Sequence, residues 1–233
     1  MNSLFEVCIS DAVLQRLPEF RVFGVCCFAI NQSQISLSDR ISRIEQKEEI
    51  AESDLRIIKA WKDFHKNNGS PKKARASIEY IIKAFSSGKL RRINPIVDLY
   101  NYASMFARAP VGAEDIEKLG GKLVLSVASG EEKFIPLMSS SIENPASKEL
   151  IWLSGNNDVV CRSINWIESD ITKITEATTS VIFISEQPIN DFLGSELAIS
   201  IIFDELSLCG FSCISEPFKI NSKTPSKIIN LCA

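Results

Sequence analysis

Histidine is almost absent from this chain of 233 residues, which contains one, His65. Ser-His-Asp triads, Cys-His pairs and metallohydrolase motifs each need histidine at a defined position. His65 lies between Trp61 and Asn68, at the polar end of an expected helix, so we expect its side chain to be solvated. The sequence therefore predicts that histidine general-base chemistry does not carry any reaction of this protein.

Metal-binding cysteine pairs and long apolar runs are also missing. None of the seven cysteines forms a Cys-x-x-Cys pair, so a zinc site would need three or four scattered thiols, and we expect no metal and no cofactor. Cys26 and Cys27 lie within an apolar run, and we expect the cysteines to be buried, reduced thiols. No segment approaches the ~18 uninterrupted apolar residues of a membrane helix, and residues 1–6 lack the basic start of a signal peptide. These absences predict a cytoplasmic protein with no membrane partner.

Acidic residues are scarce in one segment of an otherwise acidic chain. The formal net charge is -3, yet residues 56–92 contain eleven lysines and arginines against Asp63 and Glu79. Such a local excess is the electrostatic footprint expected for binding a phosphate backbone, with an incidental solvated helix face as the alternative. The side chains of this segment that we expect to contact RNA are Lys72, Lys73, Arg75, Arg91 and Arg92.

Hydrophobic periodicity predicts a strand followed by helices in the first half of the chain. Residues 20–30 are typical of a buried strand, and residues 39–66 follow helical spacing up to the stop signal Asn67-Asn68-Gly69. We expect Ser70 to cap the next helix and Pro71 to occupy its first turn, with the end at Gly88. A short buried helix is expected over residues 95–107.

Strand-like segments dominate the second half. They occupy residues 123–127, 133–137, 150–153, 159–161 and 181–184, and a helix over 188–208 and a last strand near 211–215 follow. The hydrophobic content of 45% suits a soluble globular protein with a sizeable core. Together these patterns predict one α+β domain over residues 1–233, with a β-sandwich-like sheet core and flanking helices.

The segment from residue 93 to residue 115 carries the most specific signal. Its characteristic positions are Asn94, Asp98, Asn101 and Tyr102, followed by Pro110, Ala113 and Asp115. This arrangement closely resembles the signature of the editing (B3/B4) domain of the phenylalanyl-tRNA synthetase β subunit. A shorter, freestanding branch of that family looks closer still, since it shares the Ser-x-Glu element at 77–79, the Pro-Val-Gly-Ala sequence at 110–113 and the Cys-Arg-x-x-Asn-Trp block at 161–166. The resemblance implies a B3/B4-like core at about residues 70–215, preceded by a strand and basic helices over about residues 1–69.

The resemblance also implies that tRNA or aminoacyl-tRNA is the partner, and that the protein hydrolyses misacylated tRNA in trans. An aminoacyl ester is labile, so such a site needs positioned water and hydrogen-bond donors more than a strong nucleophile. Gly112 stands where the synthetase has histidine, and Ile184 stands where it has a tyrosine-sensing glutamate, with Glu186 two residues later. We expect the pocket to contain Asn94, Asp98, Asn101, Gly112, Asn165, Thr172 and Thr175, with Arg162 facing outward toward phosphate.

Other interpretations of the same residues stay open. Asp98 and Asn101 are as compatible with capping or cross-linking a short helix as with substrate contact, and Asp115 with a helix-start cap. Asn165 and Trp166 are compatible with a buried turn. The missing histidine favours a second hypothesis, a non-catalytic RNA-binding module, and a pocket for a free amino acid or small metabolite is the third. The recognised amino acid, the tRNA and the oligomeric state are left open by the sequence.

Overall fold

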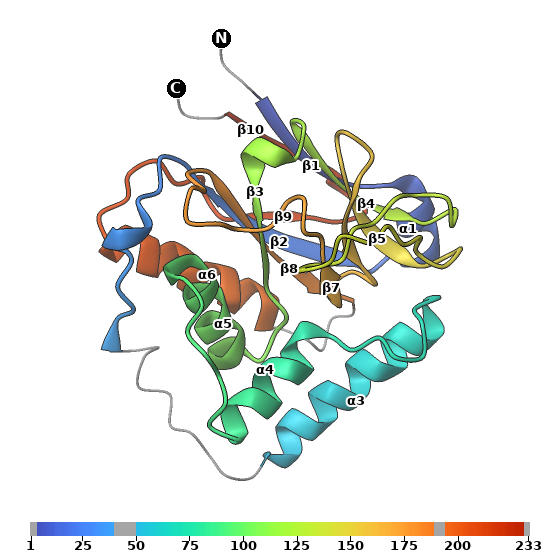
Figure 1. The fold of residues 1–233 in the computed structure, drawn as a ribbon, viewed down its shortest axis with the longest axis horizontal. Coiled ribbons are helices and arrows are strands. Elements are labelled where there is room, and N and C mark those ends of the chain that lie inside the picture. Colours follow the sequence, from blue (N-terminus) through green and yellow to red (C-terminus); the bar gives the residue numbers. More distant parts are fainter. Residues whose placement is uncertain (1–3, 40–49, 189–193, 231–233) are drawn as a thin grey trace.

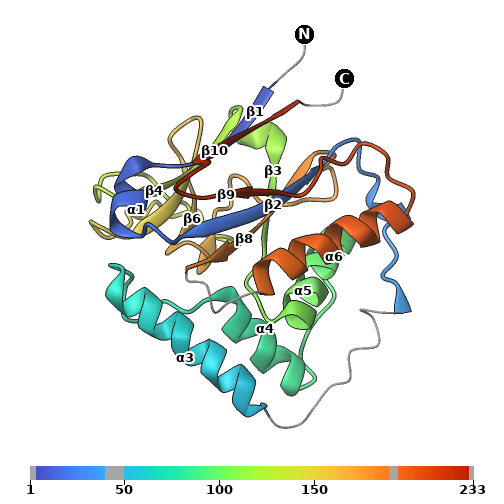
Figure 2. The ribbon, with the colours of Figure 1, turned by 180° about the vertical axis from the view of Figure 1, so that it is seen from behind.

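The computed structural model of the protein describes residues 4–39, 50–188 and 194–230. Within these ranges the chain combines helices with two β-sheets, so the predicted α+β class is confirmed. Figures 1 and 2 show the sheets gathered in one half of the molecule and the longer helices in the other.

The larger sheet has six strands within the described residues. They are β1 (Leu4–Ile9), β4 (Lys122–Val127), β5 (Leu150–Ser154), β6 (Val159–Arg162), β7 (Ile167–Glu168) and β10 (Ser226–Asn230). Their order is β10-β1-β4-β5-β6-β7. β1 runs parallel to β4 and antiparallel to β10, so both ends of the described chain belong to this sheet.

The smaller sheet contains the strands β2 (Arg21–Cys27), β3 (Gly112–Asp115), β8 (Val181–Gln187) and β9 (Phe218–Ile220). Its order is β3-β8-β2-β9, and every neighbouring pair is antiparallel. β8 is buried along its whole length and nearly all of β2 is buried, as the continuous apolar runs in their sequences predict.

Two apolar layers hold the sheets and helices together. Leu125 and Trp152 of the larger sheet pack against Val22 and Ile182 of the smaller sheet, which confirms the β-sandwich-like core. The opposite face of the smaller sheet is covered by helices. The described helices are α1 (Asp11–Arg16), α3 (Glu52–Asn67), α4 (Ser77–Ser86), α5 (Pro95–Ala107) and α6 (Gly194–Leu208), with 3-10 turns at Gln32–Gln34 (η1) and Ile116–Lys118 (η2).

Helix α5 has the bounds that the sequence predicts, because its start is strongly encoded. Asn94 is the N-cap, and its side-chain oxygen accepts a hydrogen bond from the Val97 amide at 2.9 Å. Pro95 occupies the first turn, where its missing N–H costs nothing. α5 and α6 pack on the smaller sheet, whereas α3 and α4 form a separate apolar cluster that contains Trp61 and Ile82.

Two predictions about the region before α5 are wrong. Helix α4 begins at Ser77 and not near Ser70, because residues 71–74 form a turn closed by a hydrogen bond from the Ala74 amide to the Pro71 carbonyl. His65 is buried, with 3% of its surface exposed, because the rings of Trp61 and Phe64 pack around it. The predicted helix over 39–66 is confirmed from Glu52, and residues 40–49 lie outside the described part of the chain.

Two predicted strands are reduced to single bridges. Residues 133–137 contribute one bridge from Phe134 and one from Pro136, whose ring lacks the N–H that a continuous ladder needs. Ile214 makes the one bridge of the segment 211–215. The predicted helix over 188–208 is confirmed from Gly194, and residues 189–193 lie outside the description.

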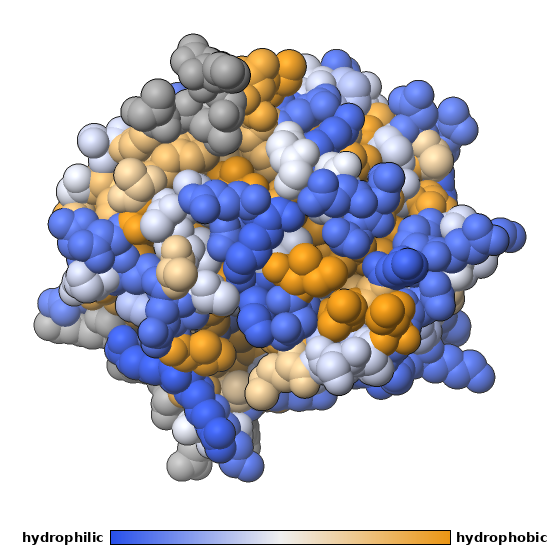
Figure 3. All heavy atoms as spheres, turned by 45° about the horizontal axis from the view of Figure 1, so that its top comes forward, coloured by the Kyte–Doolittle hydropathy of each residue, from blue (hydrophilic) through white to orange (hydrophobic). Residues whose placement is uncertain are grey.

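One of the six cysteines in the described ranges forms a disulfide. Cys8, Cys26, Cys27, Cys161 and Cys209 are free thiols, whereas Cys213 is disulfide-bonded, contrary to the expectation of reduced cysteines. No helix within the described ranges is long and apolar enough to cross a membrane. On the face shown in Figure 3, hydrophobic residues lie in small groups among hydrophilic ones.

Candidate functional site

A cavity of about 280 Å³ lies where the start of α5 approaches β3 and β7. Apolar side chains form much of its wall, among them Val97, Leu137 and Ile174. The polar residues that line it are Asn94, Tyr100, Glu114, Glu168 and Lys173. Four separate segments of the chain therefore meet around one small cavity with acidic groups in its wall.

The two glutamates of this cavity form a close carboxyl pair. Glu114 is 2% exposed, and its side chain lies within hydrogen-bonding reach of Glu168. Burial, and then the neighbouring Glu168 carboxyl, raise the pKa of Glu114 well above its ordinary value. Burial also raises the pKa of Glu168, while hydrogen bonds with Glu114 and Cys161 oppose that rise. Two such carboxyls cannot both ionise cheaply, so the pair retains a proton at higher pH than an exposed glutamate would.

The hydrogen-bonding pattern agrees with a shared proton. The Oε2 atoms of Glu114 and Glu168 are buried and receive no hydrogen bond from another residue of the described chain. A buried carboxyl oxygen without a donor is costly, and a proton held between the two groups would satisfy both. The pair can therefore act as one acid-base unit that holds a single proton.

Hydrogen-bond donors lie beside this pair. Asn94 uses its Oδ1 atom to cap α5, which leaves its Nδ2 donor available in a residue that lines the cavity. The Lys173 ammonium pairs with Asp170 Oδ1 at 2.7 Å. Burial raises the pKa of Tyr100, so its phenol stays protonated and can donate.

Gly112 and Thr172 border the carboxyl pair. A Cβ atom at Gly112 would lie 3.4 Å from Glu168 Oε1. The buried Thr172 hydroxyl has no hydrogen-bond partner among the described residues, and it lies near enough to Glu114 to oppose the rise in the pKa of that carboxyl. Gly112 is also the register partner of Ile184 in the β3–β8 pair. The two positions that depart from the synthetase signature are therefore neighbours, and the Glu168 carboxyl lies beside them.

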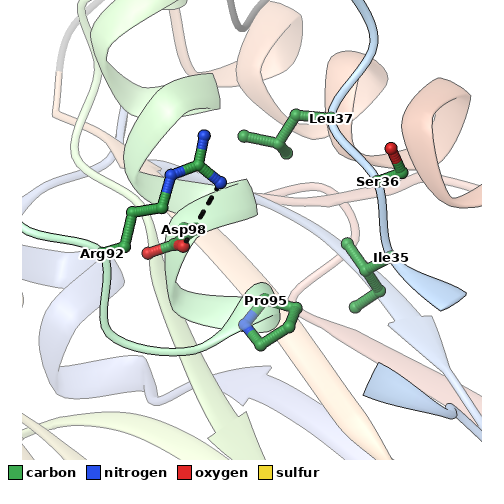
Figure 4. Close-up of a pocket in the computed structure, with 6 residues that line it drawn as sticks. All are labelled: Ile35, Ser36, Leu37, Arg92, Pro95 and Asp98. Atoms are coloured by element: carbon green, nitrogen blue, oxygen red, sulfur yellow. Dashed lines mark ion pairs between the residues drawn. The ribbon is translucent and has the colours of Figure 1, made fainter. Parts of the chain in front are cut away.

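Asp98 and Asn101 do not line the cavity of the carboxyl pair. Asp98 accepts a hydrogen bond from the Ile93 amide at 2.9 Å and lines a different cavity, of about 380 Å³, together with Arg92. Figure 4 shows Arg92 and Asp98 approaching each other there, and their charged atoms are 3.9 Å apart. Asn101 is buried within α5. Asp98 therefore contacts the local backbone, which is one of the two predicted alternatives.

Asn165, Thr175 and Asp115 make structural contacts away from the cavity. Asn165 donates to Glu186 at 3.3 Å, and the Thr175 amide donates to Thr178 at 2.9 Å. Asp115 caps the 3-10 turn η2 by accepting from the Glu117 amide, as one of the predicted alternatives has it. The structure therefore brings Asn94, Gly112 and Thr172 together around the carboxyl pair. Asn165, Thr175 and Asp115 lie apart from that pair.

Arg162 does not face outward as expected. Its side chain is 7% exposed, and its guanidinium donates to both carboxyl oxygens of Glu149, at 3.1 and 2.9 Å. It also pairs with Glu143 at 3.1 Å and packs against the Phe134 and Trp166 rings. The outward orientation is wrong because a fully buried carboxylate, Glu149, needs a charge partner in the core.

The predicted RNA-contacting cations lie in two groups. Lys72 and Lys73 are exposed in the turn before α4, and Arg75 is half-buried beside them. Arg91 and Arg92 are exposed in the segment before α5. No group of three or more potential metal-ligating side chains of the His, Cys, Asp and Glu types occurs in the part of the chain that is described.

Sequence reasoning missed the carboxyl pair. Glu114 lies within the signature segment, in the acidic pair after the Pro-Val-Gly turn, and alternation along a strand is the signal that would have aimed it inward. Glu168 gives no such signal, because β7 has two residues and, within the described ranges, pairs with β6 alone. A long-range juxtaposition of this kind follows from topology and not from local pattern.

Comparison with known proteins matches the chain to a protein family and to solved structures. The family described as the B3/4 domain matches residues 61–190. This range includes every residue that lines the cavity of Glu114 and Glu168, called the carboxyl cavity below. No curated protein matches the chain. A crystal structure of an N-terminal fragment of the phenylalanyl-tRNA synthetase β subunit from Pyrococcus horikoshii has a TM-score of 0.46 and 13% sequence identity, and the match covers 91% of this chain and 49% of that chain. The chain thus spans about half the length of that fragment.

Proposed function

Because the chain belongs to the B3/4 domain family, we propose that it binds the aminoacylated end of a tRNA and hydrolyses the ester of misacylated tRNA in trans. The observation that carries this proposal is the Glu114–Glu168 carboxyl pair in a cavity lined by the signature residue Asn94. The volume of about 280 Å³ lies near the lower end of ligand pockets, ~300–1,000 Å³, which suits an aminoacyl group.

The pair supplies the general base that a chain with one distant histidine would otherwise lack. With one shared proton, the pair keeps one ionised oxygen able to accept a proton from water, and its raised pKa brings that base closer to neutral pH. Water adds to the ester carbonyl carbon as its proton passes to the carboxylate. The bond from that carbon to the ribose oxygen then breaks, and the carboxyl returns the proton to the leaving oxygen.

The remaining cavity residues have positioning roles in this proposal. The Asn94 Nδ2 donor and the Tyr100 phenol are neutral donors that can stabilise the negative charge developing on the carbonyl oxygen. Gly112 presents no side chain beside Glu168, so an ester can approach the carboxyl closely. The apolar wall would hold the side chain of the amino acid.

Substituting one carboxyl of the pair should test the proposed base. We expect Glu168→Gln to lower the deacylation rate at least about tenfold, because removing a positioned general base typically costs ~10²–10⁴-fold and Glu114 retains part of the function. The measurement is release of labelled amino acid from a panel of mischarged tRNAs. Glu131→Gln is the matched control, since Glu131 is exposed and does not line the cavity. Absence of release from every tRNA by the unaltered protein would refute hydrolysis.

Charge reversal in the turn before α4 should weaken tRNA binding. We expect Lys72→Glu combined with Lys73→Glu to reduce affinity for uncharged tRNA about tenfold at moderate salt, with a shallower salt dependence. Arg75 is left unchanged because a carboxylate there would lie beside the buried Glu79. Lys59→Glu with Lys89→Glu is the charge-matched control, and gel shift across a salt series is the measurement. Equal loss in both variants would count against a specific surface at this turn.

A non-catalytic RNA-binding module is the second candidate function. Gly112 in place of the synthetase histidine favours it. It predicts that tRNA binding depends on Lys72 and Lys73 while no mischarged tRNA is deacylated.

A further inference from the structure

A third cavity, of about 530 Å³, lies at the junction between the end of α3 and the turn that precedes α4. Its polar wall consists of Lys62, His65, Lys66, Ser70, Lys72 and Arg75. None of its lining residues is acidic, and none lines the carboxyl cavity. The two cavities therefore have separate walls, and, of the two, acidic side chains line the carboxyl cavity alone.

The protein only partly neutralises the positive charge of this wall. The buried carboxylate of Glu79 pairs with Lys83 at 2.5 Å, with Lys62 at 3.4 Å and with Arg75 at 3.9 Å. The single Glu79 carboxylate is thus shared by three cations. Lys66 and Lys72 are exposed and make no ion pair within the described residues. The cavity is left with an excess of positive charge that an anion would offset.

The wall is also held in place before any ligand arrives. The Arg75 guanidinium donates to the carbonyls of Lys72 at 3.0 Å and Ala74 at 2.6 Å, which fixes its orientation. The preceding turn rests on Gly69, whose φ is +82° and whose hydrogen occupies a position where a Cβ would lie 2.5 Å from the Lys148 carbonyl. A preorganised set of donors loses little entropy when it binds a ligand.

His65 gives this wall a buried imidazole. Its Nδ1 atom lies 3.2 Å from Ser70 Oγ, and its Nε2 atom has no hydrogen-bond partner. Burial, and then the Arg75 charge, lower the pKa of His65 to about 4, while Glu149, Asn165 and Glu79 oppose that shift. A bound anion would oppose it further, because negative charge favours the imidazolium.

We propose that this cavity binds a phosphate group, with Lys66 and Lys72 as charge partners and Arg75 and Ser70 as oriented donors. A tetrahedral dianion can engage several cations at once, the cations of this wall line one cavity, and phosphate is a preferred ligand of lysine and arginine. The group can belong to an RNA strand or to a small phosphomonoester. The inference needs no ester hydrolysis at the carboxyl cavity.

The single histidine makes the site directly observable. The ring signals of His65 in tag-free full-length protein can be followed by NMR against pH, with inorganic phosphate, adenosine 5′-monophosphate or uncharged tRNA as probes. We expect phosphate or the nucleotide to raise the pKa of His65 saturably, by about one unit, as a nearby opposite charge does. A rise with tRNA alone also supports the site and identifies RNA as the source of phosphate.

Paired variants separate a specific site from general attraction. Lys66→Ala with Lys72→Ala should weaken phosphate or nucleotide binding about tenfold, which corresponds to ~1.4 kcal/mol. Lys59→Ala with Lys89→Ala removes the same charge from exposed positions outside the cavity and should leave affinity unchanged. The site is refuted if no probe moves the pKa of His65, or if both double variants lose affinity equally. If no mischarged tRNA is deacylated while the nucleotide raises the pKa of His65, the proposed ester hydrolysis is refuted and the proposed phosphate site is supported.

Discussion

Replacing Arg162 with methionine is expected to lower the free energy of unfolding by about 3–5 kcal/mol, the usual cost of removing one partner of a buried ion pair. Glu149 is fully buried, and the Arg162 guanidinium donates to both of its carboxyl oxygens. Without Arg162 that carboxylate would keep two donors among the described residues, the Ser163 hydroxyl and the Ala146 amide. Urea unfolding at neutral pH measures the loss.

A double variant identifies the cause of this loss. In Arg162→Met combined with Glu149→Gln no uncompensated charge is left in the core, so we expect a smaller loss of stability than in the single variant. A loss equal to the sum of both single effects would show that the pair contributes through independent contacts. The folded double variant should also bind tRNA as the unaltered protein does, since the Arg162 side chain is buried.

Arg162 also shows where the sequence stops being informative. An arginine in a Cys-Arg-x-x-Asn-Trp block has the same local pattern whether it faces phosphate or a buried acid. Its orientation depends on Glu149, which lies thirteen residues earlier, immediately before the neighbouring strand β5. The exposure of His65 is predicted wrongly for a related reason, because helical spacing does not reveal which face of a helix will be covered by distant segments such as those that contain Glu149 and Asn165.

Local signals were sufficient where the chemistry is local. The cap at Asn94 and the proline after it predict the start of α5, because both act within one helical turn. The apolar runs of β2 and β8 predict central strands for the same reason. The carboxyl pair could not be predicted, since β3 and β7 belong to different sheets and no rule of spacing relates Glu114 to Glu168.

Replacing Glu186 with glutamine is expected to make the protein more stable than the unaltered chain at high pH but not at low pH. Burial raises the pKa of Glu186 to about 7. A carboxyl whose pKa is raised by folding stabilises the protein fully below its unfolded pKa and loses that contribution as pH rises through the folded value. Between about pH 4.5 and pH 7 the loss amounts to about 3 kcal/mol, at ~1.4 kcal/mol for each pKa unit.

Glutamine fits this position if one neighbouring amide turns. Trp152 Nε1 donates to Glu186 Oε1 at 2.9 Å, and Asn165 Nδ2 donates to Oε2 at 3.3 Å. A glutamine can keep the first bond, but its NH₂ would face the Asn165 donor. Asn165 Oδ1 has no partner, so rotating that amide turns an acceptor toward the new NH₂ group. The turned Asn165 NH₂ group then faces the side on which Asn165 interacts with His65, whose Nε2 atom has no partner and can accept a hydrogen bond.

The difference in stability between the variant and the unaltered protein isolates Glu186 from His65. Burial lowers the pKa of His65 to about 4, so its contribution is lost as pH falls from about 6.5 toward 4 and opposes the Glu186 effect over nearly the same range. Because the two contributions oppose each other, the stability of the unaltered protein varies little with pH. The His65 contribution is the same in both proteins, so it cancels when their stabilities are subtracted. Urea unfolding from pH 4.5 to pH 8 should show the difference growing by about 3 kcal/mol in favour of the variant. A difference independent of pH would mean that Glu186 is ionised throughout, and the Trp152 and Asn165 donors would then be sufficient to hold a buried carboxylate.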